Sequence, residues 1–204
     1  LGHTVYLGAR DVDRGTAAAT EIGAHFVQLD VTDDTSVTAA LAAIEDADGR
    51  LDLLINNAGV LELELSGAPA LRSFDTNAVG VLRVTEAALP LLNKSPNPTV
   101  MTISSSAGSF WAVSNPDRPE YGLRAPLYSA SKAAANMLMV QYAKAYPSIK
   151  FVALEPGTTA TDLTAGMGIG RPPAESARVV VQVATAGRNS LTGTLQDEYG
   201  ELAW

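Results

Sequence analysis

The sequence predicts an α/β protein with a doubly wound parallel sheet, arranged in three αβα layers. Apolar strand-like runs alternate with helical stretches from end to end, which is typical of parallel strands joined by crossover helices. Polar residues and glycines gather directly after the predicted strands. No linker, repeat or low-complexity run interrupts the 204 residues, so we expect one domain over residues 1–204.

The amino-terminal half is expected to alternate strands and helices. We predict strands over residues 4–9, 25–29 and 51–55, and helices over residues 12–22 and 33–47. Gly23 and Gly49 stand where these helices should end, and either Thr32 or Asp33 should cap the second one.

The carboxyl-terminal half continues the alternation. A long helix is expected over residues 68–93, followed by a strand over 98–104, a helix over 126–146 and a strand over 149–154. A helix over residues 173–186 should then precede a short last strand that opens at residues 194–195.

Composition excludes several classes of function. The net charge of −8 disfavours nucleic acid as a partner. The absence of cysteine excludes disulfides and thiolate metal sites, and His3 and His25 lack partners at helical ligand spacing, so we expect no metal. No apolar run reaches membrane-spanning length and no basic region leads a signal peptide. We expect a soluble, cytoplasmic protein.

Five predicted strand ends carry polar or glycine-rich residues. These are Arg10, Asp30, residues 57–59, residues 104–106 and residues 156–157. Ligands of open parallel sheets bind outside the carboxyl ends of the strands. We therefore expect these residues to converge on one binding crevice.

Tyr128 and Lys132 place a phenol and an ammonium four residues apart on one helix face. A phenol is a poor acid at neutral pH, and lowering its pKa by ~3 units requires ~4 kcal/mol of preference for the phenolate. A nearby desolvated lysine can supply ~3–4 kcal/mol. The alternative is a buried aromatic beside a solvated lysine.

Ser105 supplies the context that favours chemistry over packing. It stands at the end of the preceding predicted strand, where its hydroxyl could hold a carbonyl oxygen beside the phenol. Ser104 and Ser106 flank it, so the choice among the three serines stays open. The alternative is that all three merely end a strand and begin a turn.

Several motifs occur together in one order along the chain. They are residues 56–59 (NNAG), 103–108 (ISSSAG), 128–132 (YSASK) and 156–157 (PG). Together they resemble the short-chain dehydrogenase/reductase family over nearly the whole chain. The resemblance implies a Rossmann-type fold and an oxidoreductase that transfers hydride between a nicotinamide cofactor and a carbonyl or alcohol.

The resemblance assigns four catalytic positions. It implies that Ser105 orients the substrate, that Tyr128 donates the proton, and that Lys132 binds the nicotinamide ribose while favouring the phenolate. Asn77 matches the asparagine that holds a water in the family's proton relay. Its alternative role is that of a polar residue that bends a helix.

The resemblance also assigns cofactor-binding positions. Beside Tyr128 and Lys132, they are Asp30 and Val31 at the adenine, Asn57, Ala58 and Gly59 at the adenosine half, and Pro156, Gly157, Thr159 and Thr161 at the carboxamide. Taken alone, Asp30 would be a loop aspartate that precedes a helix cap.

The end of the first predicted strand indicates NADP(H). Ala9 stands where NAD-type members carry an aspartate, and Arg10 stands where NADP-type members carry a basic residue that receives the 2′-phosphate. The alternative is a surface arginine paired with Asp11 or Asp13. With Arg14 and Gly15, this run most resembles the carbonyl-reductase branch.

One departure from the family pattern stands out. The glycine-rich fingerprint of the first strand and turn is absent, because the chain begins just before the family's second strand. We expect ~20–25 further amino-terminal residues in the natural protein, and a gap in the sheet without them. The glycine-rich run at residues 164–170 follows Pro156-Gly157, so we expect a mobile lid there.

The expected reaction is reduction of a ketone or aldehyde. An alcohol dehydrogenase working in the other direction and a nucleotide-sensing protein without turnover remain alternatives. The 22 residues between Ser105 and Tyr128 include Phe110, Trp111, Val113 and Tyr121. With Leu61, Leu163 and Met167 they suggest a hydrophobic substrate, although Trp111 could equally pack the insertion. Monomer and homo-oligomer remain open.

Overall fold

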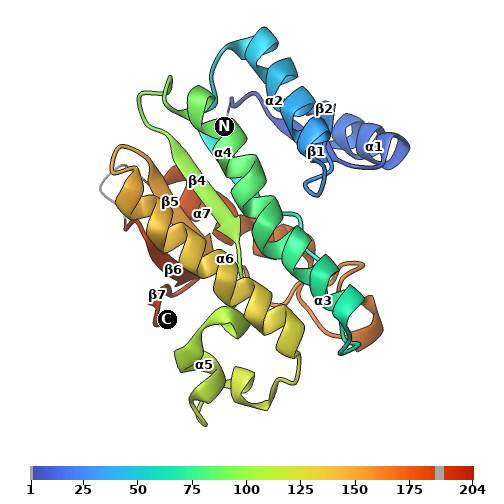
Figure 1. The fold of residues 1–204 in the computed structure, drawn as a ribbon, viewed down its shortest axis with the longest axis vertical. Helices are drawn as coiled ribbons and strands as arrows, with labels where there is room; N and C mark the ends of the chain where they lie inside the picture. The colour runs from blue at the N-terminus through green and yellow to red at the C-terminus, as the bar shows by residue number, and fades with distance from the viewer. Residues whose placement is uncertain (1, 187–190) are drawn as a thin grey trace.

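The computed structural model describes residues 2–186 and 191–204, and its strands and helices alternate as predicted (Figure 1). The first half contains β1 (Tyr6–Ala9), α1 (Val12–Ile22), β2 (His25–Gln28), α2 (Asp34–Asp48), β3 (Leu53–Asn56), α3 (Gly67–Phe74), η1 (Asp75–Val79) and α4 (Gly80–Leu92). The second half contains β4 (Thr99–Ile103), η2 (Ser106–Gly108), α5 (Phe110–Ser114), η3 (Pro119–Gly122), α6 (Pro126–Ala145), β5 (Lys150–Leu154), η4 (Ala165–Met167), α7 (Pro173–Thr185), β6 (Thr194–Asp197) and β7 (Gly200–Leu202).

Local sequence chemistry fixes the ends of α1 and α2. The Asp33 carboxylate accepts hydrogen bonds from the backbone N–H groups of Thr35 and Ser36, at 2.7 and 3.2 Å. Asp33 is therefore the cap of α2, which decides between the two predicted candidates. Gly23 and Gly49 end the two helices in the left-handed conformation, with φ of 70° and 72°.

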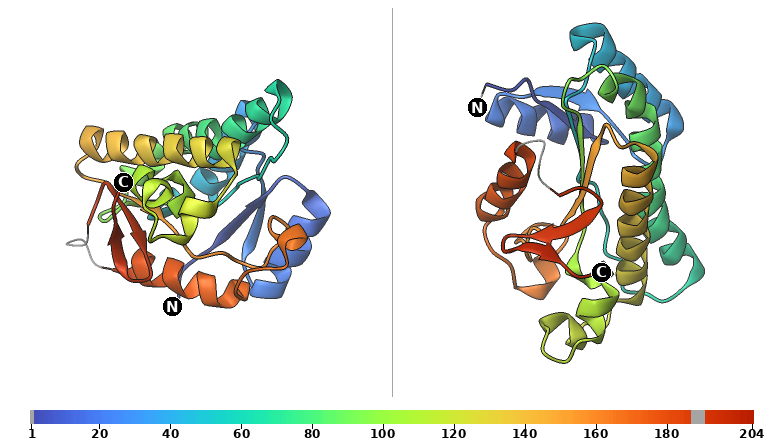
Figure 2. Two further views of the ribbon diagram at one scale, coloured as in Figure 1. Left: turned by 90° about the horizontal axis from the view of Figure 1, so that it is seen from below. Right: turned by 90° about the vertical axis from the view of Figure 1, so that its left-hand side faces the viewer.

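The structure has three layers, as predicted, with helices on both faces of the sheet. Figure 2 shows α2, α4 and α6 on one face and α1 and α7 on the other. Val100 and Phe151 pack into the core below the first set of helices, whereas Met101 and Val152 pack with Val179 of α7. Successive strand residues thus alternate between two buried faces. Among the described helices, none is long and apolar enough to cross a membrane.

The sheet is interrupted between β1 and β3. Strands β1 and β2 form a parallel pair, and β3-β4-β5-β6-β7 form a second sheet that is parallel except for the antiparallel pair β6-β7. Ile55, at the free edge of β3, is 38% exposed, whereas Val100 and Val152 in β4 and β5 are fully buried. The expected gap in the sheet is therefore present.

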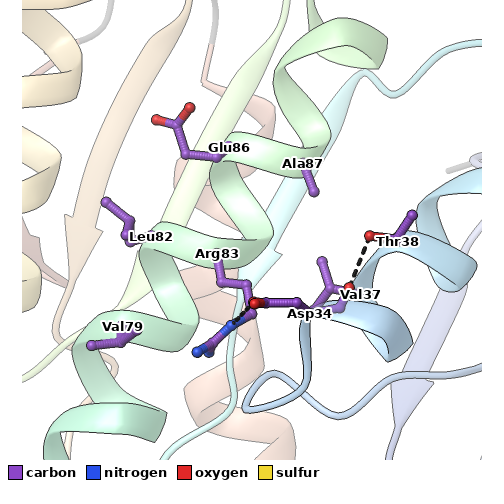
Figure 3. A pocket seen from close by; sticks show the side chains of 8 residues that line it. All are labelled: Asp34, Val37, Thr38, Val79, Leu82, Arg83, Glu86 and Ala87. Carbon is purple, nitrogen blue, oxygen red and sulfur yellow. Dashed lines mark hydrogen bonds and ion pairs between the residues drawn. The ribbon is translucent and has the colours of Figure 1, made fainter.

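Helix α2 joins the β1-β2 sheet to the rest of the protein. Val37 and Leu41 of α2 lie in the same buried core as Val81 and Val84 of α4. Arg83 of α4 adds polar contacts across this junction, and its side chain is only 18% exposed. Its guanidinium donates to the Val31 carbonyl and to the Asp34 carboxylate, and also to Asp75 at 3.3 Å. Figure 3 shows Arg83 pointing at Asp34.

The structure corrects one of the predicted elements and adds others that were not predicted. The single helix expected over residues 68–93 is divided by η1, a π-helical turn that contains Asn77. The Asn77 side chain bonds to the backbone of Val60, which explains why a regular α-helix does not continue there. The insertion before Tyr128 contains α5 and η3, and β7 follows the expected last strand.

Replacing Arg83 with methionine is expected to lower the free energy of unfolding by about 1–3 kcal/mol, because two acidic groups and a carbonyl lose their charged donor. Chemical denaturation would measure this. The same change at Arg50, whose 3.2 Å pair with Asp52 is exposed, should cost less than about 0.5 kcal/mol. Equal effects of the two variants would show that apolar packing alone holds α2 on α4.

Candidate active site

The carboxyl ends of β3, β4 and β5 lie at one edge of the sheet, because these strands are parallel and in register. Residues 57–59 follow β3, residues 104–106 follow β4, and residues 156–157 follow β5. Helix α6 begins at this same edge, next to α5 (Figure 1). The structure therefore brings the predicted motifs of the second sheet together.

Tyr128 lies in the first turn of α6, which Pro126 opens at a position where its missing N–H costs nothing. Burial is the main cause that raises the pKa of Tyr128 to about 12; the neighbouring Ser105 side chain opposes this rise and the charge of Glu155 adds to it. The phenol is therefore protonated at neutral pH. It lies beside a serine hydroxyl, as the sequence predicted.

Lys132 lies one turn farther along α6, and its side chain is almost fully enclosed at 4% exposure. Its Nζ donates to the Ile103 carbonyl at 2.7 Å and lies 5.7 Å from the centre of the Tyr128 ring. Burial lowers the pKa of Lys132 to about 8, which the charge of Glu155 partly opposes. The residue is buried, so the alternative of a solvated lysine is wrong.

The expected lowering of the Tyr128 pKa by Lys132 is not found in this structure. The pKa of Tyr128 moves up, because burial penalises the phenolate and Glu155 adds a negative charge nearby. The ammonium lies over the ring and bonds to Ile103 instead of the phenolic oxygen. From that position, the positive charge of Lys132 favours the phenolate too weakly to reverse the effect of burial on the pKa of Tyr128.

The three serines after β4 have different surroundings. Ser104 is buried, and its hydroxyl donates to the Asn136 side chain. Ser106 is also buried, whereas Ser105 is half-buried and lies near enough to Tyr128 to lower the pKa of its phenol. The Ser105 hydroxyl oxygen also accepts the backbone N–H of Ala107 at 3.1 Å. Of the three, Ser105 is thus the one beside the phenol.

Gly108 allows the serine turn to approach α6 closely. A Cβ atom placed on Gly108 would lie 2.7 Å from the backbone carbon of Lys132 and 2.8 Å from the backbone nitrogen of Ala133. The Gly108 carbonyl accepts a hydrogen bond from Asn136 at 3.2 Å. This contact between backbones holds Ser105 beside the first turn of α6.

Asn77 is buried within a polar network that joins three elements. Its Oδ1 accepts the Val60 N–H at 2.8 Å, and its Nδ2 donates to the Val60 carbonyl and to the Ser131 hydroxyl, both at 2.9 Å. Both amide hydrogens are therefore used, since an asparagine has two. Asn77 therefore fixes the loop after β3 against α6. This positioning role comes in addition to its predicted role in the proton relay.

Three of the predicted adenosine-side residues, Arg10, Asp30 and Val31, belong to the β1-β2 sheet and the turn after it. Arg10 is exposed at the end of β1, and its charge contributes to the low pKa of Asp30. Hydrogen bonds from Thr32 are the largest cause of that low pKa, at 2.7 and 2.9 Å from the Asp30 carboxylate. The Val31 carbonyl is bound by Arg83. Asp30 therefore also stabilises the turn before α2, which is the alternative role that the sequence left open.

The remaining cofactor positions follow β3 and β5. Asn57, Ala58 and Gly59 are exposed. A Cβ on Gly59 would lie 3.5 Å from Asn77 Oδ1 and 3.7 Å from Lys132 Nζ, so this segment borders the site.

The turn after β5 is built around Gly157, whose φ is 78°. The Thr159 hydroxyl donates to the Gly157 carbonyl at 2.9 Å, whereas Thr161 is exposed. A bridge between Thr159 and Arg171 closes the base of the expected lid, whose mobility stays a prediction.

Two other regions bear on the sequence predictions. The groove in Figure 3 lies between α2 and α4, and none of its lining residues belongs to the predicted site. In the insertion, the Trp111 backbone bonds to Trp204, and the Arg118 guanidinium lies 5.6 Å from the centre of the Trp111 ring. Trp111 therefore holds the insertion and the carboxyl-terminal residues together.

Sequence reasoning did not identify Glu155, Ser131 or Asn136. Glu155 acts electrostatically on both Tyr128 and Lys132. Its place between a buried strand and the Pro156-Gly157 turn was a signal that could have found it. Ser131 and Asn136 are polar positions on the helix face that carries Lys132, which only the packing of α6 distinguishes from solvent-facing ones.

Comparison with known proteins gives a consistent result. A family model described as short chain dehydrogenase matches residues 1–170. A short-chain dehydrogenase/reductase of Aspergillus fumigatus is 32% identical, over 98% of this chain and 84% of its own. The (-)-isopiperitenone reductase of Mentha piperita is 30% identical, over 78% of this chain and 74% of its own.

A solved structure, the NADPH-bound carbonyl reductase from chicken fatty liver, superposes with a TM-score of 0.81. It is 26% identical in sequence, and the match covers 98% of this chain and 88% of that one.

Replacing Gly108 with alanine is expected to lower the free energy of unfolding by about 1–3 kcal/mol, because the new methyl group would overlap the α6 backbone. Chemical denaturation would measure this loss. Gly67→Ala is the matched control, since a Cβ there meets nothing within 4 Å. It should be neutral or stabilising by up to about 1 kcal/mol. A Gly108→Ala variant as stable as Gly67→Ala would contradict the close approach.

Proposed function

This chain belongs to the short-chain dehydrogenase/reductase family, and we propose that it is an NADP(H)-dependent enzyme that reduces a ketone or aldehyde. Members of the family are oxidoreductases that use a nicotinamide cofactor and act on small molecules. The observation that carries the proposal is the placement of the protonated Tyr128 one turn before the buried Lys132 on α6, with the Ser105 side chain near enough to lower the pKa of the phenol.

The residues around Lys132 fit the ribose of such a cofactor. An ammonium has three N–H donors, and among the described residues only the Ile103 carbonyl accepts one from Lys132. The ammonium is buried, so its other donors require acceptors that a ribose diol would supply. Gly59 borders Nζ and has no side chain to fill that space.

The other predicted cofactor positions complete this assignment. We assign the carboxamide end to Pro156, Gly157, Thr159 and Thr161, and the adenosine half to Asp30, Val31 and residues 57–59. Arg10 would bind the 2′-phosphate. Among the described residues no carboxylate forms an ion pair with Arg10, so the expected alternative of pairing with Asp11 or Asp13 receives no support.

The proposed chemistry assigns one task to each side chain. When bound, the cofactor would supply the hydride that the carbonyl carbon accepts. Ser105 donates a hydrogen bond to the carbonyl oxygen, and Tyr128 transfers its phenolic proton to that oxygen. Lys132 stabilises the resulting phenolate by its charge. Asn77 holds the water through which Tyr128 regains a proton.

A hydrophobic substrate is favoured by the apolar side chains around the carboxyl edge of the sheet. Phe110 of α5 is 76% exposed, and Leu163 and Met167 in the loop after β5 are 40% and 41% exposed. Such surface next to a polar centre is typical of sites for small apolar ligands. The carbonyl reductase named above was solved with NADPH, which agrees with the cofactor assignment.

Tyr128→Phe is expected to lower turnover of ketones and aldehydes by about 10²- to 10⁴-fold, because the general acid is lost. NADPH oxidation would measure turnover, and fluorescence titration would show that NADPH binding is retained. Tyr146→Phe is the control, since Tyr146 lies at the opposite end of α6 from Tyr128. Near-normal turnover by Tyr128→Phe would refute the assignment. NADPH binding without turnover by the unaltered protein would favour a nucleotide sensor.

Arg10→Gln is expected to weaken NADPH binding by about 10- to 100-fold, since a charged donor to the 2′-phosphate is lost. Binding of NADH should change less than twofold. Calorimetric titration of both cofactors would measure the two affinities. The same substitution at the exposed Arg178 of α7 provides the control. Equal losses for both cofactors would contradict a role in recognising the phosphate.

A further inference from the structure

Glu155 joins the two turns that the proposed reaction needs. One of its carboxylate oxygens, Oε2, accepts the backbone N–H of Ser106 at 2.6 Å. The other, Oε1, accepts the backbone N–H of Gly157 at 2.7 Å. Both are short hydrogen bonds to a charged acceptor, which makes them stronger than ordinary backbone bonds. A single side chain therefore connects the serine turn to the Pro156-Gly157 turn.

The sheet register places Glu155 where it can make both bonds. Ile103 of β4 pairs with Leu154 of β5, and the Ser104 N–H donates to the Leu154 carbonyl at 2.7 Å. Ser106 is the first residue of η2, so its N–H has no acceptor within the helix. A carboxylate that only tightened its own turn would bond to Gly157 alone.

The charge of Glu155 also acts on the predicted catalytic side chains of α6. It raises the pKa of both Tyr128 and Lys132, against burial in the case of the lysine. A partly buried carboxylate thus favours the protonated forms of the phenol and of the ammonium.

Other charged groups near these turns are paired with one another. Arg171 packs against Gly157 and bonds to Glu198 at 2.9 Å. On the side of the insertion, Arg118 bonds to Glu120 at 3.0 Å.

We propose that Glu155 is a positioning residue of the active site, which clamps the Ser105 turn to the nicotinamide-side turn and sets the charge beside Tyr128 and Lys132. This inference rests on the proposed function for its effect on turnover. The hydrogen bonds by which Glu155 holds the two turns together do not depend on the proposed function. Two consequences follow, one for the backbone and one for the pH dependence.

The first consequence is tested by amide hydrogen exchange, followed by NMR on the whole protein without substrate. Glu155→Gln retains one acceptor oxygen but turns an NH₂ group toward the other backbone N–H. Exchange at Ser106, at Gly157 or at both should become at least about tenfold faster. Glu21→Gln, an exposed change on α1, should leave both rates within about twofold of those of the unaltered protein.

The second consequence is tested by the pH profile of NADPH-dependent turnover. Without the negative charge the pKa values of both Lys132 and Tyr128 fall, so the alkaline limb, which begins with loss of the Lys132 proton, should move down by about one pH unit in Glu155→Gln. Glu155→Asp keeps the charge but is one methylene too short to hold both turns. The alkaline limb of Glu155→Asp should stay within about 0.3 pH units of that of the unaltered protein. Turnover should fall by about 10- to 100-fold in both variants.

The outcomes separate this inference from the proposed function. Unchanged amide exchange in Glu155→Gln, or alkaline limbs that coincide in the Gln and Asp variants, would overturn the role of Glu155. Absence of carbonyl reduction by the unaltered protein would overturn the proposed function, and amide exchange would still decide on the clamp. If Glu155→Gln does not fold, faster exchange at Ser106 or Gly157 in Glu155→Asp supports the clamp and unchanged exchange refutes it.

Discussion

An ammonium group withdrawn from water needs new acceptors, and Lys132 is only 4% exposed. Its bond to the Ile103 carbonyl requires β4 to end at that residue and α6 to pack against the end of the strand. The same packing requires a glycine at position 108, because the two backbones touch there. The placement of Ser105 beside Tyr128 follows from this burial, since the serine turn continues directly from Ile103.

Burial also sets the proton affinities of the site, in opposite directions for its two titratable groups. It raises the pKa of the phenol and lowers that of the ammonium, because each prefers its neutral form in a poorly solvated place. Glu155 then favours the protonated form of both. A tyrosine that keeps its proton beside a serine hydroxyl is suited to giving that proton to a carbonyl oxygen, which links the electrostatics of the site to the proposed reduction.

The two parts of the predicted cofactor site belong to different sheets. The nicotinamide-side residues lie at the edge of one continuous sheet, whereas Arg10 and Asp30 belong to the separate β1-β2 pair. That pair reaches the rest of the protein through α2, its apolar contacts with α4, and the hydrogen bonds of Arg83. The distance between the two ends of a bound dinucleotide would therefore depend on how firmly α2 holds to α4.

The sequence by itself determined the alternation of strands and helices and the helix end at Gly49, because both follow from periodicity or from residues adjacent in the chain. It left Thr32 and Asp33 as candidate caps of α2, and the gap in the sheet followed from the resemblance to the family. The sequence also indicated Ser105, Tyr128 and Lys132 through motifs of fixed spacing. Only the tertiary structure decided among the three serines, divided the long helix at Asn77, raised the pKa of Tyr128 and revealed Glu155. Those features arise from burial and from contacts between residues far apart in the chain, which local patterns do not record.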